Sequence, residues 1–529
     1  MRKIFVTIIA LSTFMSAYAG GLLTNTNQSV HFLRNPARGA SMEIDAVYTN
    51  PAGLAKLPVN GWHFTLNNQS AFQTRTITST FAPFAGFGGE ETKVFEGKTT
   101  APFIPSLFAV YKMDKWAFSA NIGVIGGGGT ITFDKGLASF EAPISMIPMQ
   151  LRANGLLGAD GNPCNYSVNT YMEGSSIIYD GQLGATYAIN DMFSVYAGGR
   201  INFVNNSYVG HIRDISINPA HPMLNPTGEM MLATTFFTNA QQLAQGASAS
   251  LLPIINGGAG GYTLDQLVAA GQMSPEQLAQ LAGGLGLSPQ EGGAMTVLQI
   301  QGGYDQAAAT YGASANQTAN KELDCTQSGM GITPILGFNF NWENLNVGVK
   351  YEFNTKIDVK NKTKVDDVNQ FPDGEKTPYD IPAWLSVGAQ YKIIPSVSVS
   401  AGYHHFFDSN AKMANDKQKH IDGGINEFLL GAEWQINKMF LVSAGGQLTK
   451  TGVTDDYQTD MAYSLNSYSV GMGGAINVTE KIRINLAYFF TKYEDWTKES
   501  TNYNGLPLPG KDTFSRTNNV FGIGVDFRF

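Results

Sequence analysis

The chain ends with the sequence TNNVFGIGVDFRF, residues 517–529, which is its most informative stretch about fold. From Phe521 to Phe529 every second residue is Phe, Ile or Val, whereas the residues between them are Gly, Asp or Arg. Successive side chains of a β-strand point to opposite faces, so one face here is apolar and the other is polar. An ordinary amphipathic edge strand, the alternative, would expose five apolar side chains to water and invite aggregation. The pattern therefore favours a transmembrane strand whose apolar face contacts lipid.

Similar alternating segments, separated by turns, recur along the chain. We predict strands at residues 61–79, 104–112, 115–133, 176–189, 192–212, 331–342, 345–359, 383–392, 396–407, 427–436, 439–450, 463–477, 481–493 and 517–529. Short connections, such as Met113-Asp114 and Glu343-Asn344, alternate strictly with longer ones, as periplasmic turns alternate with extracellular loops. The sequence therefore predicts an all-β protein, in which residues 60–529 form a 14-stranded antiparallel transmembrane β-barrel.

The composition suits a barrel wall and excludes other classes of protein. Of the 529 residues, 14% are charged and 11% are aromatic, and 59 are Gly. A wall with lipid on one side and water on the other needs few charges, whereas a disordered chain would lack the aromatic residues. The net charge of −8, with no stripe of Lys or Arg, argues against nucleic acid as a partner.

Residues 1–19 have the features of a secretory signal peptide. Arg2 and Lys3 are basic, an apolar stretch runs from Ile4 to Phe14, and Ala17-Tyr18-Ala19 has the form of a cleavage site. We expect the mature chain to begin at Gly20. No later run of about 18 apolar residues is present, so the chain must cross a membrane as a closed barrel if it crosses one at all.

No enzyme motif is recognisable. The sequence has no Gly-x-Ser-x-Gly elbow, and none of its seven His residues has the spacing of a helical zinc site. His404 and His405 are neighbours on one predicted strand and point to opposite faces. A hydrolase site assembled from separate strands is the alternative that a single sequence leaves open. We predict no enzymatic activity, no cofactor and no metal.

Residues 37–57, immediately before the first strand, read ARGASMEIDAVYTNPAGLAKL. Pro51 fixes its own φ and restricts Asn50, and Gly53 permits a turn, so the segment is too irregular for a strand. A plain surface turn is one interpretation. However, Asn50-Pro51-Ala52-Gly53, which follows Ala46-Val47-Tyr48-Thr49 and lies between the signal peptide and the first strand, resembles the hatch motif of the FadL/TodX/OmpP1 family. This family consists of outer-membrane transporters of long-chain fatty acids and other hydrophobic compounds.

The resemblance implies a fold and a function. Residues 20–59, with Asn50, Pro51, Ala52 and Gly53, would form a small plug, the hatch, inside a barrel of fourteen strands. We expect a monomer in the outer membrane of a Gram-negative bacterium, which takes up hydrophobic small molecules passively and contacts membrane lipid. A chain that ends in Phe529 also resembles the signal read by the outer-membrane assembly machinery. A nonspecific porin or a surface adhesin on the same barrel is the competing hypothesis.

Gly126, Gly127, Gly128 and Gly129 interrupt the third predicted strand. Glycines within a strand often mark a bulge or a sharp bend, and a flexible loop tip is the alternative. In the family, the third strand is kinked inward and opens a gap through which ligand leaves sideways into the membrane. The resemblance therefore implies a lateral gate here, since an apolar ligand gains free energy by leaving directly into lipid.

The loop at about residues 213–330 is too long for structureless coil. Thr263 with Gln266 has the form of a capping box, and Ser274 and Ser288 each precede Pro, as is typical of helix N-termini. We therefore predict a partly helical extracellular loop. It carries an apolar patch consisting of Met230, Met231, Leu232, Phe236 and Phe237. The patch is either a satellite core or a groove that captures greasy molecules, as loops 3 and 4 form in the family.

Strand parity places Arg200, Lys350 and Arg483 toward the lumen. They would either contact an anionic head group or form an ion-pair network with Glu352 and Asp526 that fixes the plug to the wall.

The chain contains two cysteines, Cys164 and Cys325. Both fall in predicted loops at the same end of the barrel, and secreted proteins form disulfides. We predict a bond between them, with two free thiols as the alternative.

Overall fold

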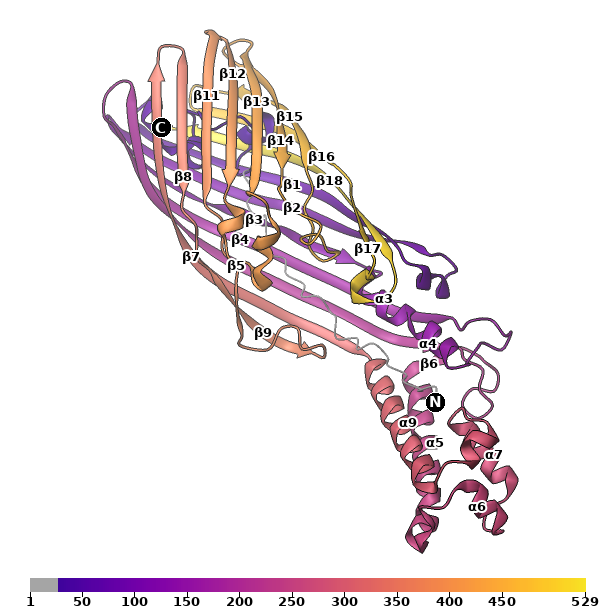
Figure 1. The fold of residues 1–529 in the computed structure, drawn as a ribbon. Coiled ribbons are helices and arrows are strands. Elements are labelled where there is room, and N and C mark those ends of the chain that lie inside the picture. Colours follow the sequence, from indigo (N-terminus) through magenta and orange to yellow (C-terminus); the bar gives the residue numbers. More distant parts are fainter. Residues whose placement is uncertain (1–26) are drawn as a thin grey trace.

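Residues 61–528 form a closed antiparallel barrel (Figure 1). The structure is a computed structural model that describes residues 27–529, so the signal peptide predicted for residues 1–19 lies outside the described residues. Strand β18 pairs with β1 and closes the cylinder. Within the described residues the barrel has fourteen strands, as predicted. They are β1 Gly61–Thr80, β2 Thr92–Met113, β3 Trp116–Phe133, β4 Tyr166–Ala188, β5 Phe193–Ile217, β7 Lys321–Trp342, β8 Leu345–Glu352, β11 Trp384–Ile394, β12 Val397–Phe406, β13 Ile425–Gln435, β14 Phe440–Lys450, β15 Ser467–Asn477, β16 Ile482–Tyr493 and β18 Gly510–Arg528.

Short strands extend the wall at the end of the barrel that carries the long loops. They are β6 Met231–Leu232, β9 Asp358–Asp366, β10 Lys376–Pro378 and β17 Trp496–Ser500. Strand β9 pairs with the part of β7 that β8 does not reach, and β17 pairs with the start of β18. These strands therefore continue the ladders of the barrel and are not additional spans.

The predicted alternation of short and long connections is confirmed. Residues 114–115 join β2 to β3 and residues 343–344 join β7 to β8, whereas residues 218–320 separate β5 from β7. Strand boundaries differ from the prediction mainly at the long-loop end. Strand β2 begins at Thr92 and β7 begins at Lys321, about ten residues earlier than predicted. Both faces of these upper segments carry polar residues, so the apolar alternation that signals a lipid-facing strand stops before the strand does.

The two faces of the wall differ as the alternation predicts. On β18, Phe521 and Ile523 are 52% and 51% exposed on the outside, whereas Val520 is buried inside. On β1, Trp62 and Leu66 are exposed, and Thr65 between them is buried. The outer face is therefore apolar over many strands, and a surface of this kind is stable in contact with lipid.

Exposed tryptophans gather near the short-turn end of the barrel. Trp116, Trp342 and Trp434 each lie at the end of a strand that meets a short turn, and Trp62 lies at the start of β1, beside the end of β2. Each is between 42% and 55% exposed. Trp62 packs on Tyr111, with the ring centroids 4.9 Å apart. Aromatic side chains with one polar edge favour the boundary between hydrocarbon and water, so this belt marks one membrane interface.

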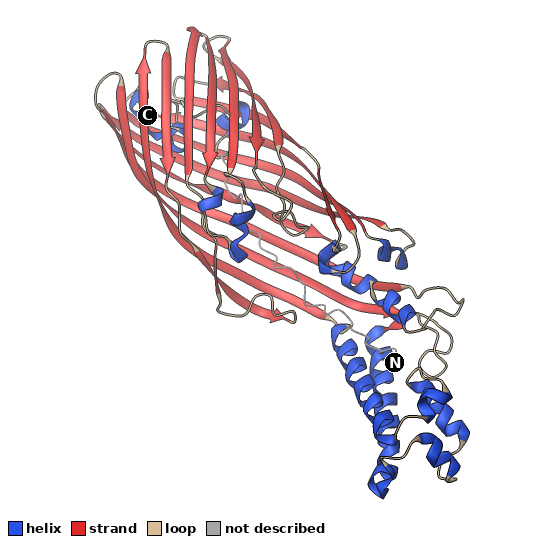
Figure 2. Ribbon diagram, viewed as in Figure 1, coloured by secondary structure: helices blue, strands red, loops and turns tan. Residues whose placement is uncertain are grey.

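The N-terminal segment lies inside the barrel (Figure 2). It consists of two short α-helices and a 3₁₀-helix, α1 Val30–Arg34, α2 Ala46–Thr49 and η1 Pro51–Lys56. Ser29 caps α1 by accepting a hydrogen bond from the backbone N–H of Phe32, and Pro51 occupies the first turn of η1. Nearly all residues from Gln28 to Leu54 are buried. We refer to residues 27–60 as the hatch.

Further helices lie in the long loops. They are η2 Ala82–Gly86, α3 Ala138–Ser145, α4 Ile147–Ala153, η4 Asp408–Asn410, η5 Ala414–His420 and η6 Tyr503–Gly505 near the barrel, and α5 Ala233–Ile254, the π-helical turn η3 Ile255–Ala259, α6 Leu264–Ala269, α7 Pro275–Gly284, α8 Pro289–Gly293 and α9 Val297–Gln317 in the loop between β5 and β7. Helices α5 and α9 lie side by side and, with α6 to α8, project from the barrel as a helical arm, residues 233–317 (Figure 1).

The helical arm is stabilised as the sequence indicates. The capping box of Thr263 and Gln266 is present, and Ser274 and Ser288 cap α7 and α8 in the same way. A separate apolar core within the arm includes Leu251, Leu264 and Ile300. Among residues 27–529 no helix combines the length and hydropathy that a membrane span requires.

Candidate functional site

The motif Asn50-Pro51-Ala52-Gly53 lies where the hatch meets the wall. The side-chain amide of Asn50 donates to the Ser41 carbonyl at 2.9 Å and to Oδ1 of Asn339 on β7 at 2.7 Å. A Cβ on Gly53 would lie 2.4 Å from the Ser41 carbonyl oxygen, so only glycine fits in this turn. Asn50 and Gly53 thus fold the hatch back on itself and attach it to β7.

The two residues between them are bound by β5 and β4, the next strands of the wall beside β7. Thr186 on β4 donates its hydroxyl to the Pro51 carbonyl, and Ser194 on β5 donates to the Ala52 carbonyl, both at 2.7 Å. The four residues of the motif therefore contact three strands, which explains their irregular geometry better than a surface turn does.

Glycines of the wall create the space that the hatch occupies. A Cβ on Gly388 of β11 would lie 2.3 Å from the carbonyl carbon of Gly39, and one on Gly348 of β8 would lie 2.2 Å from the Gly39 carbonyl oxygen. A Cβ on Gly431 of β13 would lie 1.9 Å from Oδ1 of Asn35. Backbone of the hatch thus contacts backbone of β8 and β11, and the Asn35 side chain contacts β13, so the hatch lies directly against these strands.

Buried ion pairs also fasten the hatch. Arg38 donates to both carboxylate oxygens of Asp45 at 2.7 Å and to Oε2 of Glu433 on β13 at 3.1 Å. Glu43 accepts from Arg483 on β16 at 2.7 Å, and His31 contacts Asp526 on β18 at 3.1 Å. Because breaking a buried pair by removing one partner leaves an uncompensated charge, this network strongly favours the seated hatch.

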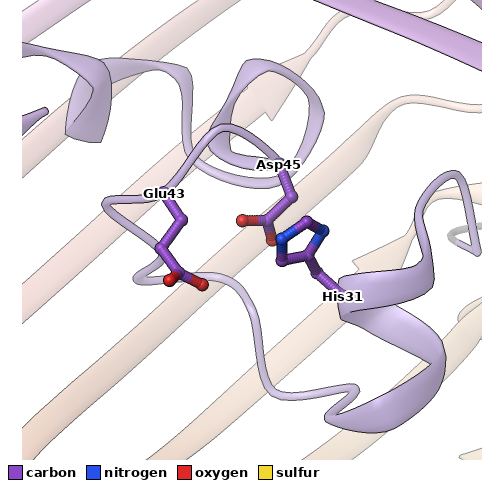
Figure 3. A group of neighbouring side chains, drawn as sticks. All are labelled: His31, Glu43 and Asp45. Carbon is purple, nitrogen blue, oxygen red and sulfur yellow. The ribbon is translucent and has the colours of Figure 1, made fainter. Parts of the chain in front are cut away.

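His31, Glu43 and Asp45 come together within this network (Figure 3). Their ligand atoms lie within 4.8 Å of one another, a spacing that a metal ion could bridge. However, Arg38 already donates to Glu43 at 2.8 Å and to Asp45 at 2.7 Å. A guanidinium therefore neutralises the carboxylates that a metal ion would need, and the cluster serves to hold the hatch in place.

The predicted luminal charges Arg200 and Lys350 form a second network. Arg200 Nη1 donates to Oε2 of Glu352 at 2.6 Å, and Lys350 Nζ donates to Oε1 of the same carboxylate at 2.8 Å. Lys350 also donates to the Tyr48 carbonyl of the hatch at 2.6 Å and lies 3.6 Å from the centre of the Trp384 ring. Arg200 and Lys350 therefore form an ion-pair network that contacts the hatch, which is the second of the two predicted alternatives.

Arg483 and Asp526 both join an ion-pair network, but each pairs with a residue of the hatch. Arg483 binds Glu43, and Asp526 binds His31. The hatch brings its own acidic and basic groups into the lumen, and wall parity alone does not show them. All three predicted luminal cations are thus bound by carboxylates in this structure.

The hydrogen-bond ladder between β2 and β3 is interrupted. Lys98 pairs with Thr132 and Leu107 pairs with Ile122, but residues 99–106 and 123–131 form no ladder pairs with each other. On its other side β3 remains paired with β4, with register shifts on both sides of Gly126. The glycine run predicted to mark a bend therefore lies within the only part of the described barrel wall where two long neighbouring strands lose their pairing midway.

Both strands have local reasons for the interruption. Gly127 and Gly129 have φ values of +90° and +69°, which other residues adopt only with strain. Pro102 and Pro105 of β2 have no backbone N–H to donate across the gap. These prolines, opposite the glycine run, are a signal that the sequence analysis did not use. Pro102 fell outside the second predicted strand, which began at residue 104, and Pro105 fell inside that strand without being interpreted as a break.

The two strands remain in contact at both ends of the interruption. A Cβ on Gly129 would lie 3.9 Å from Cβ of Ala101, and one on Gly123 would lie 3.4 Å from Cβ of Ser106. Inside the barrel, Ser106 donates its hydroxyl to the Gln28 carbonyl at the start of the hatch. The beginning of the hatch thus lies behind the unpaired segment of the wall.

An apolar zone lines the lumen beside the interruption. It joins Ile125 of β3 to the hatch residue Tyr48 and to side chains of β4, β5, β11 and β12. Its luminal members include Ile178, Val204, Trp384 and Phe406. Tyr48 and Trp384 pack with their ring centroids 5.8 Å apart. This zone gives the lumen an apolar region at the level of the unpaired segment.

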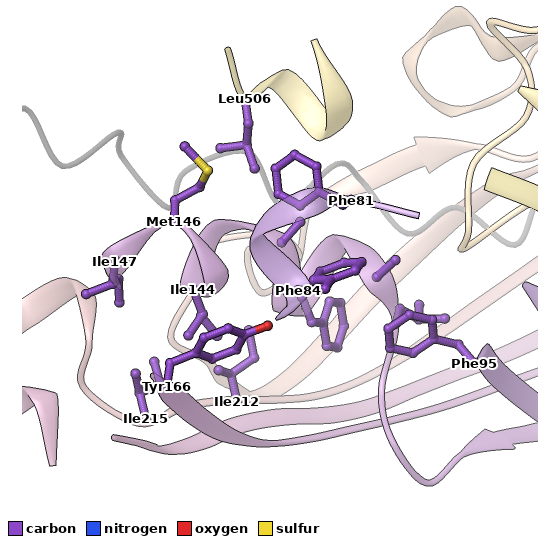
Figure 4. Packing of buried hydrophobic residues seen from close by; sticks show 14 of the residues in the cluster. Phe81, Phe84, Phe95, Ile144, Met146, Ile147, Tyr166, Ile212, Ile215 and Leu506 are labelled. Carbon is purple, nitrogen blue, oxygen red and sulfur yellow. The ribbon is translucent and has the colours of Figure 1, made fainter. Parts of the chain in front are cut away.

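A larger apolar cluster covers the long-loop end of the barrel (Figure 4). We call it the cap. It combines Phe81 and Phe84 from the β1–β2 loop, Ile144 from α3, Tyr166 from β4 and Leu506 from the β16–β18 connection. These side chains are 2% exposed or less. Loops from several hairpins are therefore held together over the barrel by apolar packing.

The five residues of the predicted apolar patch lie partly in the core and partly on the surface. Phe236 and Phe237 are 1% and 3% exposed and belong to the cap, so they attach the helical arm to the barrel and offer no surface to a ligand. Met230 and Leu232 are exposed, and Met231 is partly buried against the cap. For the two phenylalanines, the satellite-core alternative is the one found.

An apolar pocket lies elsewhere on the same end of the barrel. Its wall includes Phe140, Gly210, Ile212, Leu323, Val368 and Met461. It lies between the ends of β5 and β7 and the connection from β9 to β10, with α3 beside it. We call it the rim pocket. The two strand ends that flank the loop of residues 218–320 thus line it, together with the β9–β10 connection.

The predicted disulfide is wrong. Cys164 and Cys325 are both buried free thiols. Cys325 lies within β7, because that strand begins earlier than predicted, and its sulfur accepts from the Thr363 hydroxyl at 3.3 Å. Cys164 lies before β4 against the Leu156 carbonyl, 3.9 Å away. Burial raises the pKa of the Cys164 thiol, so the thiol remains protonated at neutral pH.

Comparison with known proteins identifies the fold. No protein-family model matches the sequence, and no curated protein does. The crystal structure of a Pseudomonas aeruginosa FadL homologue matches with a TM-score of 0.55 and 13% identity, over 96% of this chain and 99% of that chain. The chain has the fold of a FadL homologue. The resemblance predicted from residues 50–53 is thus confirmed for the fold.

Other solved structures with this architecture match less closely. The Pseudomonas putida toluene transporter TodX has 15% identity over 92% of this chain and 95% of that chain, with a TM-score of 0.47. The Ralstonia pickettii toluene transporter TbuX has 14% identity over 93% of this chain and 98% of that chain, with a TM-score of 0.45.

Proposed function

We propose that the protein is a passive channel for hydrophobic molecules, such as long-chain fatty acids, in the outer membrane of a Gram-negative bacterium. The observation that carries this proposal is a plugged lumen beside an unpaired segment of the wall. The hatch fills the barrel at the Gly39–Gly388 contact, while β2 and β3 lose their pairing over residues 99–106 and 123–131. An obstructed bore with a weakened side suits a solute that dissolves in lipid.

The proposed route begins at the rim pocket. An apolar molecule would bind between Ile212 and Leu323, pass through the cap and reach the apolar zone around Ile125 and Trp384. It would then leave sideways at Gly126–Gly129. Transfer of apolar surface from water into lipid supplies about 25 cal/mol per Å², so the route needs no cofactor and no external energy source.

The outer surface supports the proposed location. The apolar outer face of the wall and the belt of Trp62, Trp116, Trp342 and Trp434 fit a bilayer with the short turns at one interface. We assign the long-loop end to the exterior, and we propose that Phe529 serves the assembly machinery of the outer membrane. The protein would act as a monomer, with lipid around it.

A nonspecific porin is the second candidate. A porin needs a continuous aqueous channel, and the buried pairs Arg38–Asp45 and Arg483–Glu43 instead hold a plug in the bore. The hatch therefore favours a selective route over a pore. The helical arm would suit an adhesin, and an adhesin role predicts cell binding that depends on residues 233–317.

Uptake measurements test the proposal directly. The protein is produced in a Gram-negative host that lacks its own fatty acid uptake channel, and its presence in the outer membrane is verified by fractionation. Cells that contain it should take up radiolabelled hexadecanoate or toluene faster than cells with an empty vector. Single-channel recordings in planar bilayers should show little ion conductance. Large conductance without faster uptake would favour the porin, and neither signal from correctly inserted protein would overturn the channel.

A further inference from the structure

Two luminal arginines, Arg75 and Arg516, are not among the three luminal cations that were predicted from the sequence. Arg75 on β1 and Arg516 on β18 are directly opposite each other in the strand pairing. Alternation on both strands points them into the barrel, on the faces that carry buried Ile77 and Phe514. Within residues 27–529 neither of them forms an ion pair, in contrast to Arg200 and Arg483.

The contacts of both guanidinium groups are with neutral partners. Arg75 Nε donates to Oε1 of Gln73 at 3.0 Å, and its guanidinium carbon lies 5.7 Å from the centre of the Tyr463 ring. Arg516 lies over the Tyr493 ring at 4.7 Å, and its Nε is buried with no hydrogen-bond partner. Aromatic faces attract cations, but they do not replace the charge-assisted hydrogen bonds of a carboxylate.

This arrangement is unfavourable for the empty protein. Like charges directly opposite in an antiparallel ladder repel, and each guanidinium has lost part of its hydration. The four fully buried cations of the described residues each have a carboxylate partner: Arg34, Arg38, Arg200 and Lys350. Arg75 and Arg516 have no such partner among the described residues, so the pair has unused donor capacity that an anion would satisfy.

The position of the pair suits an amphipathic ligand. Along the luminal face of β1, Ala71 belongs to the apolar packing around the hatch and Ile77 belongs to the cap, with Arg75 between them. Along β18, Val520 and Phe514 flank Arg516 in the same way. The arginines thus form a polar belt between two apolar regions.

The pair also lies at the interrupted wall. A Cβ on Gly128 of β3 would be 3.5 Å from Nη2 of Arg75. An anionic group bound by Arg75 would therefore lie beside the glycine run, with the apolar zone around Ile125 within reach of an attached hydrocarbon tail.

We propose that Arg75 and Arg516 bind the anionic head group of an amphipathic ligand at the inner side of the β2–β3 interruption. The inference rests on the proposed function and narrows it, because it selects molecules with one anionic head and an apolar tail over neutral hydrocarbons. Two guanidinium groups on adjacent strands can bind one carboxylate through several charge-assisted hydrogen bonds.

Equilibrium binding of two matched probes tests the inference. Wild-type protein in lipid nanodiscs at pH 8 is titrated with tritiated hexadecanoate and with tritiated hexadecan-1-ol, which share a tail length and differ in head group. Arg75→Gln and Arg516→Gln should each weaken hexadecanoate binding about tenfold and leave the alcohol unchanged. Arg75→Lys should retain part of the hexadecanoate affinity. Arg152→Gln, on exposed α4, is the matched control and should bind both probes like the wild type.

A stability measurement separates this role from a structural one. Removing one of two repelling charges should raise the melting temperature of the ligand-free barrel, so Arg75→Gln is expected to fold. Equal weakening of both probes, or no change in either, would overturn the anion site. Wild-type binding of the alcohol alone would also overturn it while leaving the proposed function intact. Failure of the wild type to bind either probe would contradict both.

Discussion

The side-chain amide of Asn50 donates to Oδ1 of Asn339 at 2.7 Å, which joins the hatch motif to the barrel wall. Both side chains are fully buried. Removing the Asn50 amide takes a donor from the buried Ser41 carbonyl and one of two donors from Asn339 Oδ1, which keeps its bond from Asn346. We predict that Asn50→Ala destabilises the seated hatch by about 1–3 kcal/mol, the cost of an unsatisfied buried polar group. Brief openings should then appear in planar-bilayer recordings, and Asn154→Ala, on the exposed end of α4, should show none. Identical recordings for the two variants would show that Asn50 does not keep the hatch closed.

The wall glycines that contact the hatch can be compared with a neighbouring glycine that does not. Gly388 and Gly402 face each other across β11 and β12. A Cβ on Gly388 would lie 2.3 Å from the Gly39 carbonyl carbon, whereas one on Gly402 would meet nothing closer than Leu429, at 3.5 Å. Gly388→Ala should therefore displace the hatch and cost about 1–3 kcal/mol of overpacking, and Gly402→Ala should be tolerated. Thermal melting in detergent and ion conductance report the two effects, and equal behaviour of the variants would contradict the proposed close fit.

The cap should respond to pH through Asp460. Burial, with the neighbouring charge of Asp512, raises the pKa of Asp460 to about 6, although its Oδ2 accepts from the Ser139 N–H at 2.7 Å. A raised carboxyl pKa means that the folded state binds the proton more tightly than the unfolded state. The stability contributed by protonated Asp460 is therefore complete below about pH 4 and is lost as the pH rises through about 6.

Asp460→Asn isolates this effect. The variant is neutral at every pH and retains an oxygen that can accept from Ser139. Unfolding experiments from pH 4 to pH 6.5 should show the wild type losing up to about 3 kcal/mol relative to the variant, at about 1.4 kcal/mol per pKa unit. Parallel profiles for the two proteins would show that another group causes any pH dependence of the cap.

The helical arm should be dispensable for the barrel. Its core around Leu251 and Leu264 is separate from the cap, and the Thr234 hydroxyl donates to the Thr318 carbonyl at 2.9 Å where the arm begins and ends. Replacing residues 239–313 with a short Gly-Ser linker keeps this contact and the buried Phe236 and Phe237. The shortened protein should fold with an unchanged melting temperature and retain uptake.

We predict that uptake depends on the rim pocket and does not depend on the helical arm. Leu323→Glu places a charge in the apolar pocket and should lower uptake severalfold without affecting assembly. Loss of uptake in the shortened protein, with normal uptake by Leu323→Glu, would place capture on the arm instead.

The barrel could be predicted because lipid imposes a simple rule on the outer face. Apolar and polar residues alternate wherever a strand crosses hydrocarbon, as from Phe521 to Phe529, and short turns separate these strands at one end. Where β2 and β7 continue beyond the lipid, the rule no longer applies. The predicted starts at residues 104 and 331 therefore came too late, and Cys325 was placed in a loop.

The interior could be predicted only in part. The residue types at positions 50, 51 and 53 predicted an irregular segment. Pro51 fixes its own φ and restricts Asn50, and Gly53 permits a turn. The partners of luminal charges depend on which hatch residue faces which strand, and no local pattern encodes that. Arg483 therefore pairs with Glu43, more than four hundred residues away in the chain, and the unpaired arginines at residues 75 and 516 were not foreseen.

The lateral route can be closed reversibly. In a variant with Cys164 and Cys325 replaced by serine, Ala101→Cys and Gly129→Cys would place two Cβ atoms about 3.9 Å apart across the β2–β3 interruption, within the range for a disulfide. The reduced form of the same variant is the control. A second disulfide between Gly388→Cys and Gly402→Cys is unsuitable as a control, because the hatch lies against Gly388.

Uptake of radiolabelled hexadecanoate by cells with the oxidised and the reduced Ala101→Cys/Gly129→Cys variant is therefore the most direct test of the account. The account predicts slow uptake when the disulfide is formed and recovery to the rate of the cysteine-free parent after reduction. Equal, rapid uptake in both states, with the bond verified by mass spectrometry, would contradict lateral exit between β2 and β3.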